Sequence, residues 1–272
     1  RLEKGDYYLS DGEWNDLRTL DRLGLPIVLL INAGGPVELA DLLDGAVHIE
    51  AVLQLSQLGQ VGGHAVADVL LGKTTPEGKL TATWARRYTD YPCAESFSYL
   101  DGDLEKAVYR EGIYVGYRYF DSFGVQPLFP FGYGLSYTDF SLRFAGLRVG
   151  ADAIEVDVEV ENAGICFSGR EVAQVYISCP QNGGAKELRR LAGFAKTRLL
   201  APEQRQTLTI CIPQKQLATF AAQKQGWVVE QGLYGVWVGN SSAAVTLCAQ
   251  IRVDADTVIE QTHPSCPLHQ PL

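Results

Sequence analysis

Short continuous apolar runs closed by glycine turns dominate the first half of the chain. Residues 25–36 (LPIVLLINAGGP) have the pattern of a parallel strand buried on both faces and closed by a tight turn, and we expect a helix over residues 37–43. The plan repeats with a strand at residues 51–55, a glycine turn at 59–63 and a helix at 64–71. Two strand–turn–helix units in succession predict an α/β layer.

The hydrophobic period changes to two after about Ser141. In residues 154–161, Ile and Val alternate with Asp and Glu, as in an antiparallel strand with one face in the core and its acids in water. Similar runs recur at residues 172–177, 207–212, 234–238 and 245–251. About 110 residues of this pattern predict an immunoglobulin-like or fibronectin-type β-sandwich.

These two patterns define the predicted organisation. We expect a partial α/β sandwich domain with a mainly parallel sheet at residues 1–138, followed by an all-β fibronectin type III-like sandwich at 139–253. Residues 86–107 lose periodicity and are interpreted as an irregular surface loop. Residues 254–272 are polar and contain three prolines, which is typical of a linker or tail.

Charge and cysteine content narrow the class of protein. The net charge of -9 argues against a nucleic-acid surface, and the longest apolar run, residues 27–31, is too short to cross a bilayer. Six cysteines without a CxxC pair argue against zinc and predict free thiols in a reducing compartment, for which we expect the bacterial cytoplasm. Because the chain begins at Arg1 and contains no methionine, we interpret it as a piece of a longer protein.

An aromatic segment, residues 109–140, holds eleven of the chain's 27 aromatic residues (13 Tyr, 10 Phe and 4 Trp). Rings bury a large apolar area, so the segment is interpreted as a packing seam between two domains, with a saccharide-stacking surface as the alternative. Glu111 lies inside it and is the most suggestive acid for glycoside hydrolysis, although a capping or ion-pair role accounts for it as well.

Other catalytic and cofactor motifs are missing from the sequence. There is no G-x-S-x-G, no dinucleotide-binding or P-loop motif, and no histidine pair spaced for a helical metal site. The glycine turns at residues 32–35 and 59–63 are therefore interpreted as sites of tight strand–helix packing rather than phosphate binding. No cofactor and no metal is expected.

Several segments resemble, in order and approximate spacing, the C-terminal half of a glycoside hydrolase family 3 β-glucosidase. They are PIVLLINAGGPV at 26–37, GQVGGHAVADVLLGKTTPEGKL at 59–80, EGIYVGYRYFD at 111–121 and PLFPFGYGLSYT at 127–138. Three further segments resemble the fibronectin-type module of that family. They are GREVAQVYIS at 169–178, KELRRLAGFAK at 186–196 and WVVEQGLYGVWVG at 227–239. Residues 56–58 and Val61 depart from the family pattern around the GQxGG turn.

The resemblance implies a retaining, exo-acting enzyme that removes terminal β-D-glucosyl residues from β-glucosides or β-linked oligosaccharides. In this family a barrel domain supplies an aspartate nucleophile, and the α/β domain supplies an acid/base glutamate. That glutamate belongs to a GEGxDR-like motif a few residues before a segment such as KGDYYLSDGE, here residues 4–13. We therefore assign no catalytic residue to this chain and expect it to pack against a barrel domain.

A substrate rim is expected in the irregular loop, where Tyr91, Phe97 and Tyr99 are candidates to border the aglycone site; the alternative is a plain surface loop. In some family members the barrel follows the sandwich, in which case residues 254–272 lead into it. Three other functions stay open: a non-catalytic carbohydrate-binding or assembly module, a β-xylosidase or other family 3 glycosidase, and a nucleotide-dependent α/β enzyme. The sequence does not indicate an oligomeric state.

Overall fold

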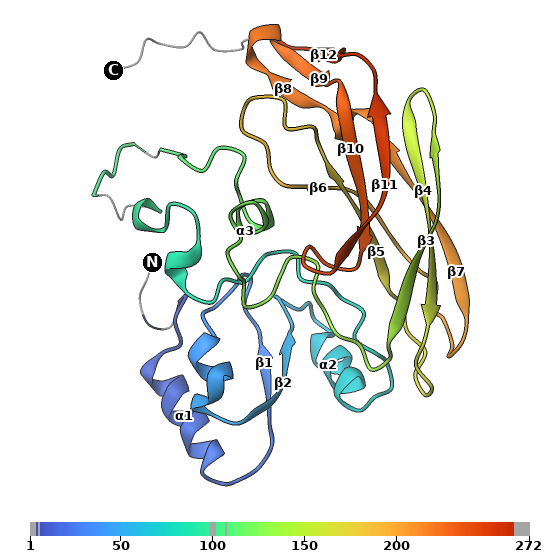
Figure 1. The fold of residues 1–272 in the computed structure, drawn as a ribbon. Helices are drawn as coiled ribbons and strands as arrows, with labels where there is room; N and C mark the ends of the chain where they lie inside the picture. The colour runs from blue at the N-terminus through green and yellow to red at the C-terminus, as the bar shows by residue number, and fades with distance from the viewer. Residues whose placement is uncertain (1–3, 5, 98–101, 107, 264–272) are drawn as a thin grey trace. The chain divides into compact units, whose positions relative to one another are not determined.

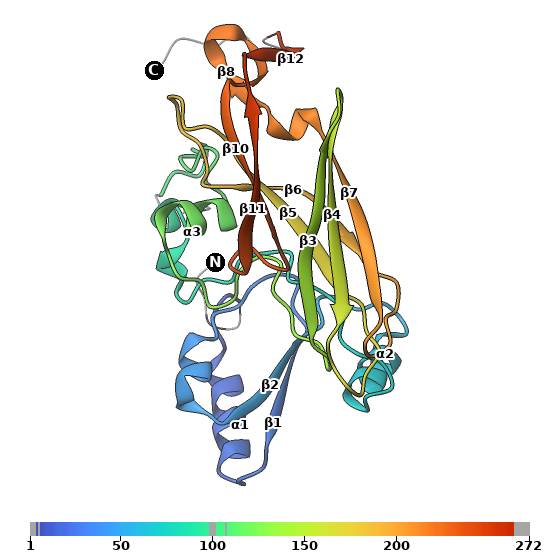
Figure 2. The same ribbon diagram turned by 45° about the vertical axis from the view of Figure 1, so that its right-hand side comes forward.

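The computed structural model describes residues 4, 6–97, 102–106 and 108–263 of the chain. It divides into two compact units (Figures 1 and 2). The first unit is Arg1–Thr138 with Ser241–Ala243, and the second is Asp139–Asn240 with Ala244–Leu272. Each unit has a hydrophobic core of its own.

The first unit is built on two parallel strands, β1 (Ile27–Ile31) and β2 (Ile49–Gln54), as the apolar runs predict. One face of this small sheet packs on a core that includes Ile27, Ile31 and Leu42. The helices of the unit are α1 (Asp11–Asp21), α2 (Gly62–Leu70) and α3 (Tyr117–Phe123). The prediction of an α/β domain with a parallel sheet is confirmed, and α2 is the predicted second helix.

The opposite face of the two-stranded sheet is open in the first unit. Val28 and Leu30 alternate with the buried residues of β1 and are 48% and 40% exposed. Parallel sheets are normally covered on both faces, so apolar strands with one bare face are typical of an incomplete α/β layer. The fold class of a partial α/β domain rests on this observation.

The helix predicted over residues 37–43 begins three residues later than expected, because residues 40–41 are its first helical residues. The segment is irregular up to Leu39, and a π-helical turn, Leu42–Ala46, follows. The backbone N–H of Glu38 donates to the Tyr7 carbonyl (2.9 Å). The side-chain carboxylate of Glu38 accepts the N–H of Tyr88 (2.8 Å). These contacts with distant segments replace local helix formation over residues 37–39. Gly45, with a φ of 105°, departs from helical geometry inside this turn.

Helix α1 was not predicted, although its sequence carries a start signal. Ser10 accepts the backbone N–H of Glu13, and the Glu13 carboxylate accepts the N–H of Ser10, which is a complete capping box. Leu17 is the residue of α1 that is buried. A single buried position produces little hydrophobic periodicity, so the cap was the signal available in the sequence.

The second unit is a β-sandwich, as predicted. Its core contains Ile154, Val156, Val158 and Val160 of β4, which are at most 4% exposed, while the acids between them lie on the other face. One sheet has the order β3-β4-β7 (Phe140–Val149, Ala153–Asn162 and Arg205–Pro213). The other has the order β11-β10-β5-β6 (Val245–Val253, Gly232–Gly239, Val172–Ser178 and Arg190–Lys196).

A third, small sheet corrects the expected tail. Strands β8 (Thr219–Ala221), β9 (Gly226–Val229) and β12 (Thr257–Gln261) pair in the order β12-β9-β8. Residues 257–261 are therefore a strand, not a linker. As an edge strand β12 keeps most side chains exposed, so its composition is as polar as that of a tail, and its backbone pairing with β9 is invisible in the sequence.

Candidate functional site

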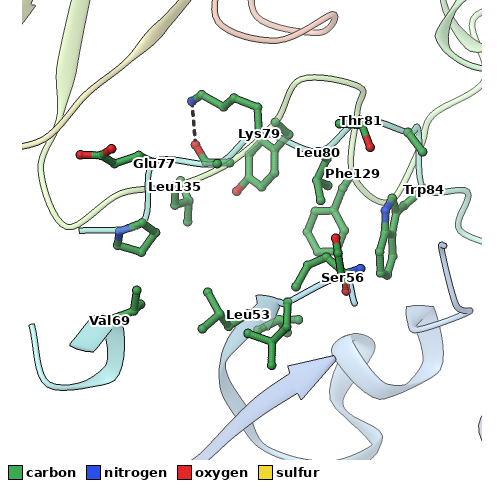
Figure 3. Close-up of a pocket in the computed structure, with 18 of the residues that line it drawn as sticks. Leu53, Ser56, Val69, Glu77, Lys79, Leu80, Thr81, Trp84, Phe129 and Leu135 are labelled. Carbon is green, nitrogen blue, oxygen red and sulfur yellow. Dashed lines mark hydrogen bonds between the residues drawn. The ribbon is translucent and has the colours of Figure 1, made fainter. Parts of the chain in front are cut away.

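A cavity of about 510 Å³ lies at the carboxyl ends of the two parallel strands (Figure 3). The turn after β1 contributes Gly34 and Gly35, and β2 contributes Leu53 and Gln54. The side of α2 and the segments 75–84 and 129–135 complete the wall. In open α/β sheets, ligands bind at this edge, so the cavity is the first place to look for a site.

The wall of this cavity is mainly apolar, with few polar groups. Gln54 donates from Nε2 to the Ala33 carbonyl (2.9 Å), and its buried Oε1 has no hydrogen-bond partner. Lys79 donates to the Gly134 carbonyl (2.9 Å), a contact visible in Figure 3. Such a wall suits an apolar side chain or ring and provides no paired carboxylates for acid–base chemistry.

Gly62, at the start of α2, fits the packing interpretation. A Cβ on Gly62 would lie 2.4 Å from the Leu58 Cβ, so only glycine allows this close approach. No side chain caps the helix, whose N-cap residue is Val61. Within the Gly59–Gly63 turn, packing thus explains Gly62, whereas a Cβ on Gly59 or Gly63 would meet no atom within 4 Å.

Two of the three predicted rim residues are described, and their environments differ. Tyr91 packs edge-on against the rings of Tyr7, Tyr88 and Phe120, and its hydroxyl donates to the Thr83 carbonyl (3.2 Å). Its ring therefore belongs to an aromatic cluster inside the first unit.

Phe97 follows the 3-10 turn Ala94–Ser96 and is 62% exposed, as a rim residue must be. Tyr99 lies outside the described residues. The role of the three residues in a substrate rim stays a prediction, and among the described ones Phe97 has the exposure for it.

Part of the aromatic segment at residues 109–140 packs within the first unit, while Tyr109 is 86% exposed. Tyr117 stacks on Phe131 with ring centroids 4.9 Å apart, and Tyr114 meets Phe123 at the same distance edge-on. Helix α3 lies inside this segment and was not predicted, because its aromatic residues line more than one side and leave no clear period. For Glu111, the described contact is backbone: its carbonyl accepts the Tyr114 N–H (3.1 Å).

Sequence reasoning missed a largely buried carboxylate beside the rim loop. The side chain of Glu38 is 13% exposed, pairs with Arg87 (3.2 Å) and accepts the Tyr88 N–H. Arg87 also pairs with Asp41 (2.5 Å), and this hydrogen bond lowers the pKa of Asp41 below its usual value. Burial raises the pKa of the neighbouring Tyr7 hydroxyl. The sequence carries no local signal of this role, because the donors Arg87 and Tyr88 lie 49 and 50 residues further along the chain.

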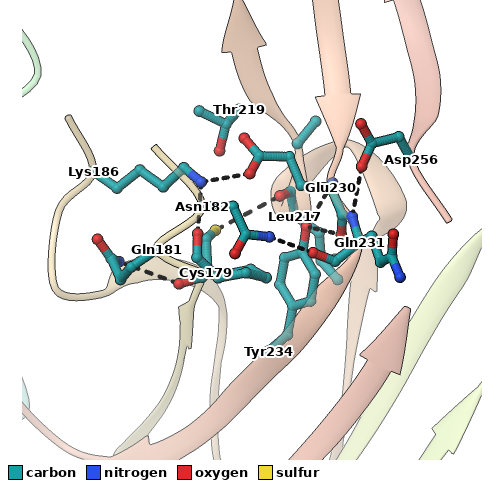
Figure 4. Close-up of polar contacts among 12 residues, drawn as sticks. Cys179, Gln181, Asn182, Lys186, Leu217, Thr219, Glu230, Gln231, Tyr234 and Asp256 are labelled. Carbon is teal, nitrogen blue, oxygen red and sulfur yellow. Dashed lines mark hydrogen bonds and ion pairs between the residues drawn. The ribbon is translucent and has the colours of Figure 1, made fainter. Parts of the chain in front are cut away.

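The second unit has a buried polar cluster of its own (Figure 4). Lys186, whose side chain is 2% exposed, donates to the Pro180 carbonyl (2.6 Å) and pairs with Glu230 (2.5 Å). The Tyr234 hydroxyl donates to the Glu230 carbonyl (3.0 Å), and burial raises its pKa. Burial also raises the pKa of the nearby Cys179 thiol. These contacts join the loop after β5 to the turn between β9 and β10.

The residues that the structure describes lack metal-binding and membrane-spanning features. They contain no group of three or more His, Cys, Asp or Glu side chains able to hold a metal. No helix in these same ranges has both the length and the apolar character to cross a membrane. The cysteines at 93, 166, 179, 211 and 248 are free thiols.

Comparison with known proteins gives these features a family context. Residues 3–117 match the model of the glycosyl hydrolase family 3 C-terminal domain, and residues 171–242 match that of the fibronectin type III-like domain. A β-glucosidase from Ruminococcus albus is 37% identical over 263 residues, which are 94% of this chain and 27% of that protein.

Solved structures give the same result. β-Glucosidase 3B from Thermotoga neapolitana in complex with α-D-glucose matches 96% of this chain with a TM-score of 0.87 and 39% identity. A β-glucosidase from Paenibacillus barengoltzii matches 97% with a TM-score of 0.89 and 37% identity. This chain spans between 27% and 36% of the length of these three relatives.

An α/β domain followed by a fibronectin type III-like sandwich, matched in this order over most of the chain, defines a part of a glycoside hydrolase. The particular family follows from the first of the two domains. The chain belongs to glycoside hydrolase family 3, as the motifs at residues 26–37, 59–80 and 111–138 predict.

Proposed function

We propose that this chain is part of a retaining, exo-acting β-glucosidase that releases terminal β-D-glucosyl residues. The observation that carries the proposal is the match of 94–97% of the chain, at 37–39% identity, to proteins that are named β-glucosidases. One of those structures is a complex with α-D-glucose, which supports glucose as the sugar recognised. β-Glucosides and β-linked oligosaccharides are the proposed substrates.

The proposed chemistry uses two carboxylates outside this chain. An aspartate of a barrel domain attacks the anomeric carbon, and an acid/base glutamate protonates the leaving oxygen and later activates water. Retention of configuration requires the two carboxyl groups to lie about 5 Å apart. The cavity of the first unit has no such pair among its lining residues, which supports a site formed elsewhere.

The test uses the full protein that contains this chain and 4-nitrophenyl β-D-glucoside. We expect release of nitrophenol with no added metal or cofactor, and β-glucose as the first anomer detected by NMR. Release of α-glucose first would overturn retention. Faster hydrolysis of the β-xyloside would favour a β-xylosidase, and no hydrolysis of any aryl glycoside would favour a non-catalytic carbohydrate-binding or assembly module.

We further propose that Phe97 borders the aglycone site. Its support is its exposure of 62% in a loop of the α/β domain. Phe97→Ala should change the KM ratio between a disaccharide and an aryl glucoside, while Phe194→Ala, at 66% exposure in the second unit, should leave that ratio unchanged. An unchanged ratio for both variants would refute the rim role.

The cytoplasm of a bacterium is the proposed location, supported by the free thiols of the described residues, which fit a reducing compartment. Fractionation of cells followed by detection of the protein tests it. Recovery from the culture medium or periplasm would contradict the proposal.

A further inference from the structure

Asn182 and Gly183 form the single Asn-Gly pair of the sequence, in the loop that follows β5. Residues 181–185 are all exposed, and Gly183 and Gly184 have positive φ angles of 69° and 73°. A Cβ placed on either glycine would meet no atom within 4 Å. The backbone next to Asn182 is therefore open to water, and no side chain on the following residue restricts it.

The Asn182 side chain ties this loop to the turn between β9 and β10. Its Nδ2 donates to the Gln231 carbonyl (2.6 Å), beside the pair between Lys186 and Glu230 (Figure 4). The backbone N–H of Gln231 in turn donates to the Asp256 carboxylate (2.8 Å). Because an ionised aspartate has no hydrogen to donate to a carbonyl, this tie requires the amide of an asparagine at residue 182.

We propose that Asn182 is a site of spontaneous deamidation, which removes the tie to Gln231. The backbone nitrogen of Gly183 loses its proton and forms a bond to Cγ of Asn182, while the bond from Cγ to Nδ2 breaks and ammonia leaves. A water molecule then opens the cyclic imide at one of its two carbonyl carbons, which yields aspartate or isoaspartate. In balance, one water is consumed, and one carboxylate and one ammonium ion are formed.

The other four asparagines lack this combination of features. Asn162 is fully buried, and Asn15 is exposed but lies inside α1, where the backbone N–H groups are held by helical hydrogen bonds. Asn32 and Asn240 are followed by alanine and serine, whose Cβ atoms crowd the attacking nitrogen. Asparagine is a thermolabile residue in general, so these differences decide which one reacts first.

Two hydrogen bonds oppose the reaction in the folded protein. The Gly183 N–H donates to the Gln181 carbonyl (3.1 Å), and the leaving Nδ2 of Asn182 is held by Gln231. Both bonds lie in an exposed loop, so we expect them to slow deamidation about tenfold relative to the unfolded chain without preventing it. Equal rates in the folded and the urea-unfolded protein would show that these bonds do not protect Asn182 and would contradict the tie.

The experiment incubates the full protein at mildly alkaline pH and follows its tryptic peptides by mass spectrometry. Asn182 is the one asparagine of peptide 171–186, and Asn15, the internal control, is the one asparagine of peptide 5–18. Deamidation adds about 1 Da, and we expect it at least about tenfold faster at Asn182 than at Asn15. Gly183→Ala should slow it at least about fivefold, because a Cβ restricts the attacking backbone.

Stability provides the second readout. Asn182→Asp, like the aged wild-type protein, loses the donor to Gln231 and should lower the unfolding transition of the second unit by roughly 1–6 °C. Asn182→Gln keeps an amide but would have to close a larger ring, so its transition should not fall further on ageing.

Each outcome decides the matter without any measurement of hydrolytic activity. Equal rates at Asn182 and Asn15 would overturn the modification site, and an unchanged transition after complete deamidation would overturn its effect on the loop. If Gly183→Ala does not fold, Asn182→Gln carries the test. An Asn182→Gln protein whose transition falls on ageing as fast as that of wild type would refute the inference, because another site would then be responsible.

Discussion

The buried pair between Lys186 and Glu230 gives the sharpest stability prediction. Lys186→Met removes an ammonium group that is 2% exposed and leaves the Glu230 carboxylate, 18% exposed, without this partner (Figure 4). Breaking a buried ion pair from one side costs about 3–5 kcal/mol, because the remaining charge stays desolvated. Since water reaches part of Glu230, we expect the lower end, about 3 kcal/mol.

The assay is thermal unfolding of the purified protein followed by calorimetry. A loss of about 3 kcal/mol should lower the transition that contains the second unit by roughly 6–12 °C. Lys215→Met is the matched control, because the pair between Lys215 and Glu260 has side chains 60% and 47% exposed. Exposed pairs contribute about 0–1 kcal/mol, so the control should shift the transition by a few degrees at most.

A second substitution checks the mechanism. Glu230→Leu in the Lys186→Met background removes the stranded charge and should recover at least half of the lost stability, because apolar residues often replace a buried pair without cost. Equal shifts for Lys186→Met and Lys215→Met would refute the reasoning. So would a double variant that is less stable than Lys186→Met alone, since desolvation of Glu230 would then not be the cause.

Three further substitutions or measurements follow from local geometry. Gly239→Ala should cost more than about 2 kcal/mol, because the new Cβ would lie 1.8 Å from the Ala244 carbonyl oxygen, which is backbone. Hydrogen bonds from Arg148 and Thr209 lower the pKa of Asp157, so its stabilising contribution holds above about pH 4 and is lost as the pH falls through the lowered pKa. The Cys179 thiol is buried and should react with a disulfide reagent only after unfolding.

Each of these three predictions has a control or an outcome that would contradict it. Gly59→Ala, with no atom within 4 Å of the new Cβ, should be close to neutral by urea denaturation, and an equally small effect at Gly239 would contradict the model of strain. The stability difference between wild type and Asp157→Asn should shrink below pH 4, and a constant difference would rule out the linkage. Cys211 is exposed and should react in the folded protein; equal rates for Cys179 would mean that its site opens.

Features that depend on neighbours in the chain were predictable. The alternation of apolar and acidic residues through 154–161 predicts the core strand β4, which has the burial expected. The apolar runs predict β1 and β2, and the motif order predicts the family. In these segments each side chain's environment repeats with the local geometry of the backbone, so a short window of sequence is sufficient.

Features that depend on contacts between distant segments were not predictable from the sequence. Residues 37–39 belong to the predicted helix, yet bonds from Glu38 to Tyr7 and Tyr88 hold them in another conformation, and the helical turns begin at residue 40. The sequence of β12 was interpreted as a tail because its partner strand β9 lies about 30 residues earlier and pairs with it through the backbone.

The same distinction between local patterns and distant contacts applies to the candidate site. The sequence by itself determined the two domain classes, the family and the absence of a cofactor motif, because each is a pattern of residue types along the chain. Only the tertiary structure decided that Tyr91 packs against other rings while Phe97 is exposed, and that Glu38 is a largely buried carboxylate between three segments. Burial and pairing of a polar side chain depend on what folds against it, and a linear pattern carries no record of that partner.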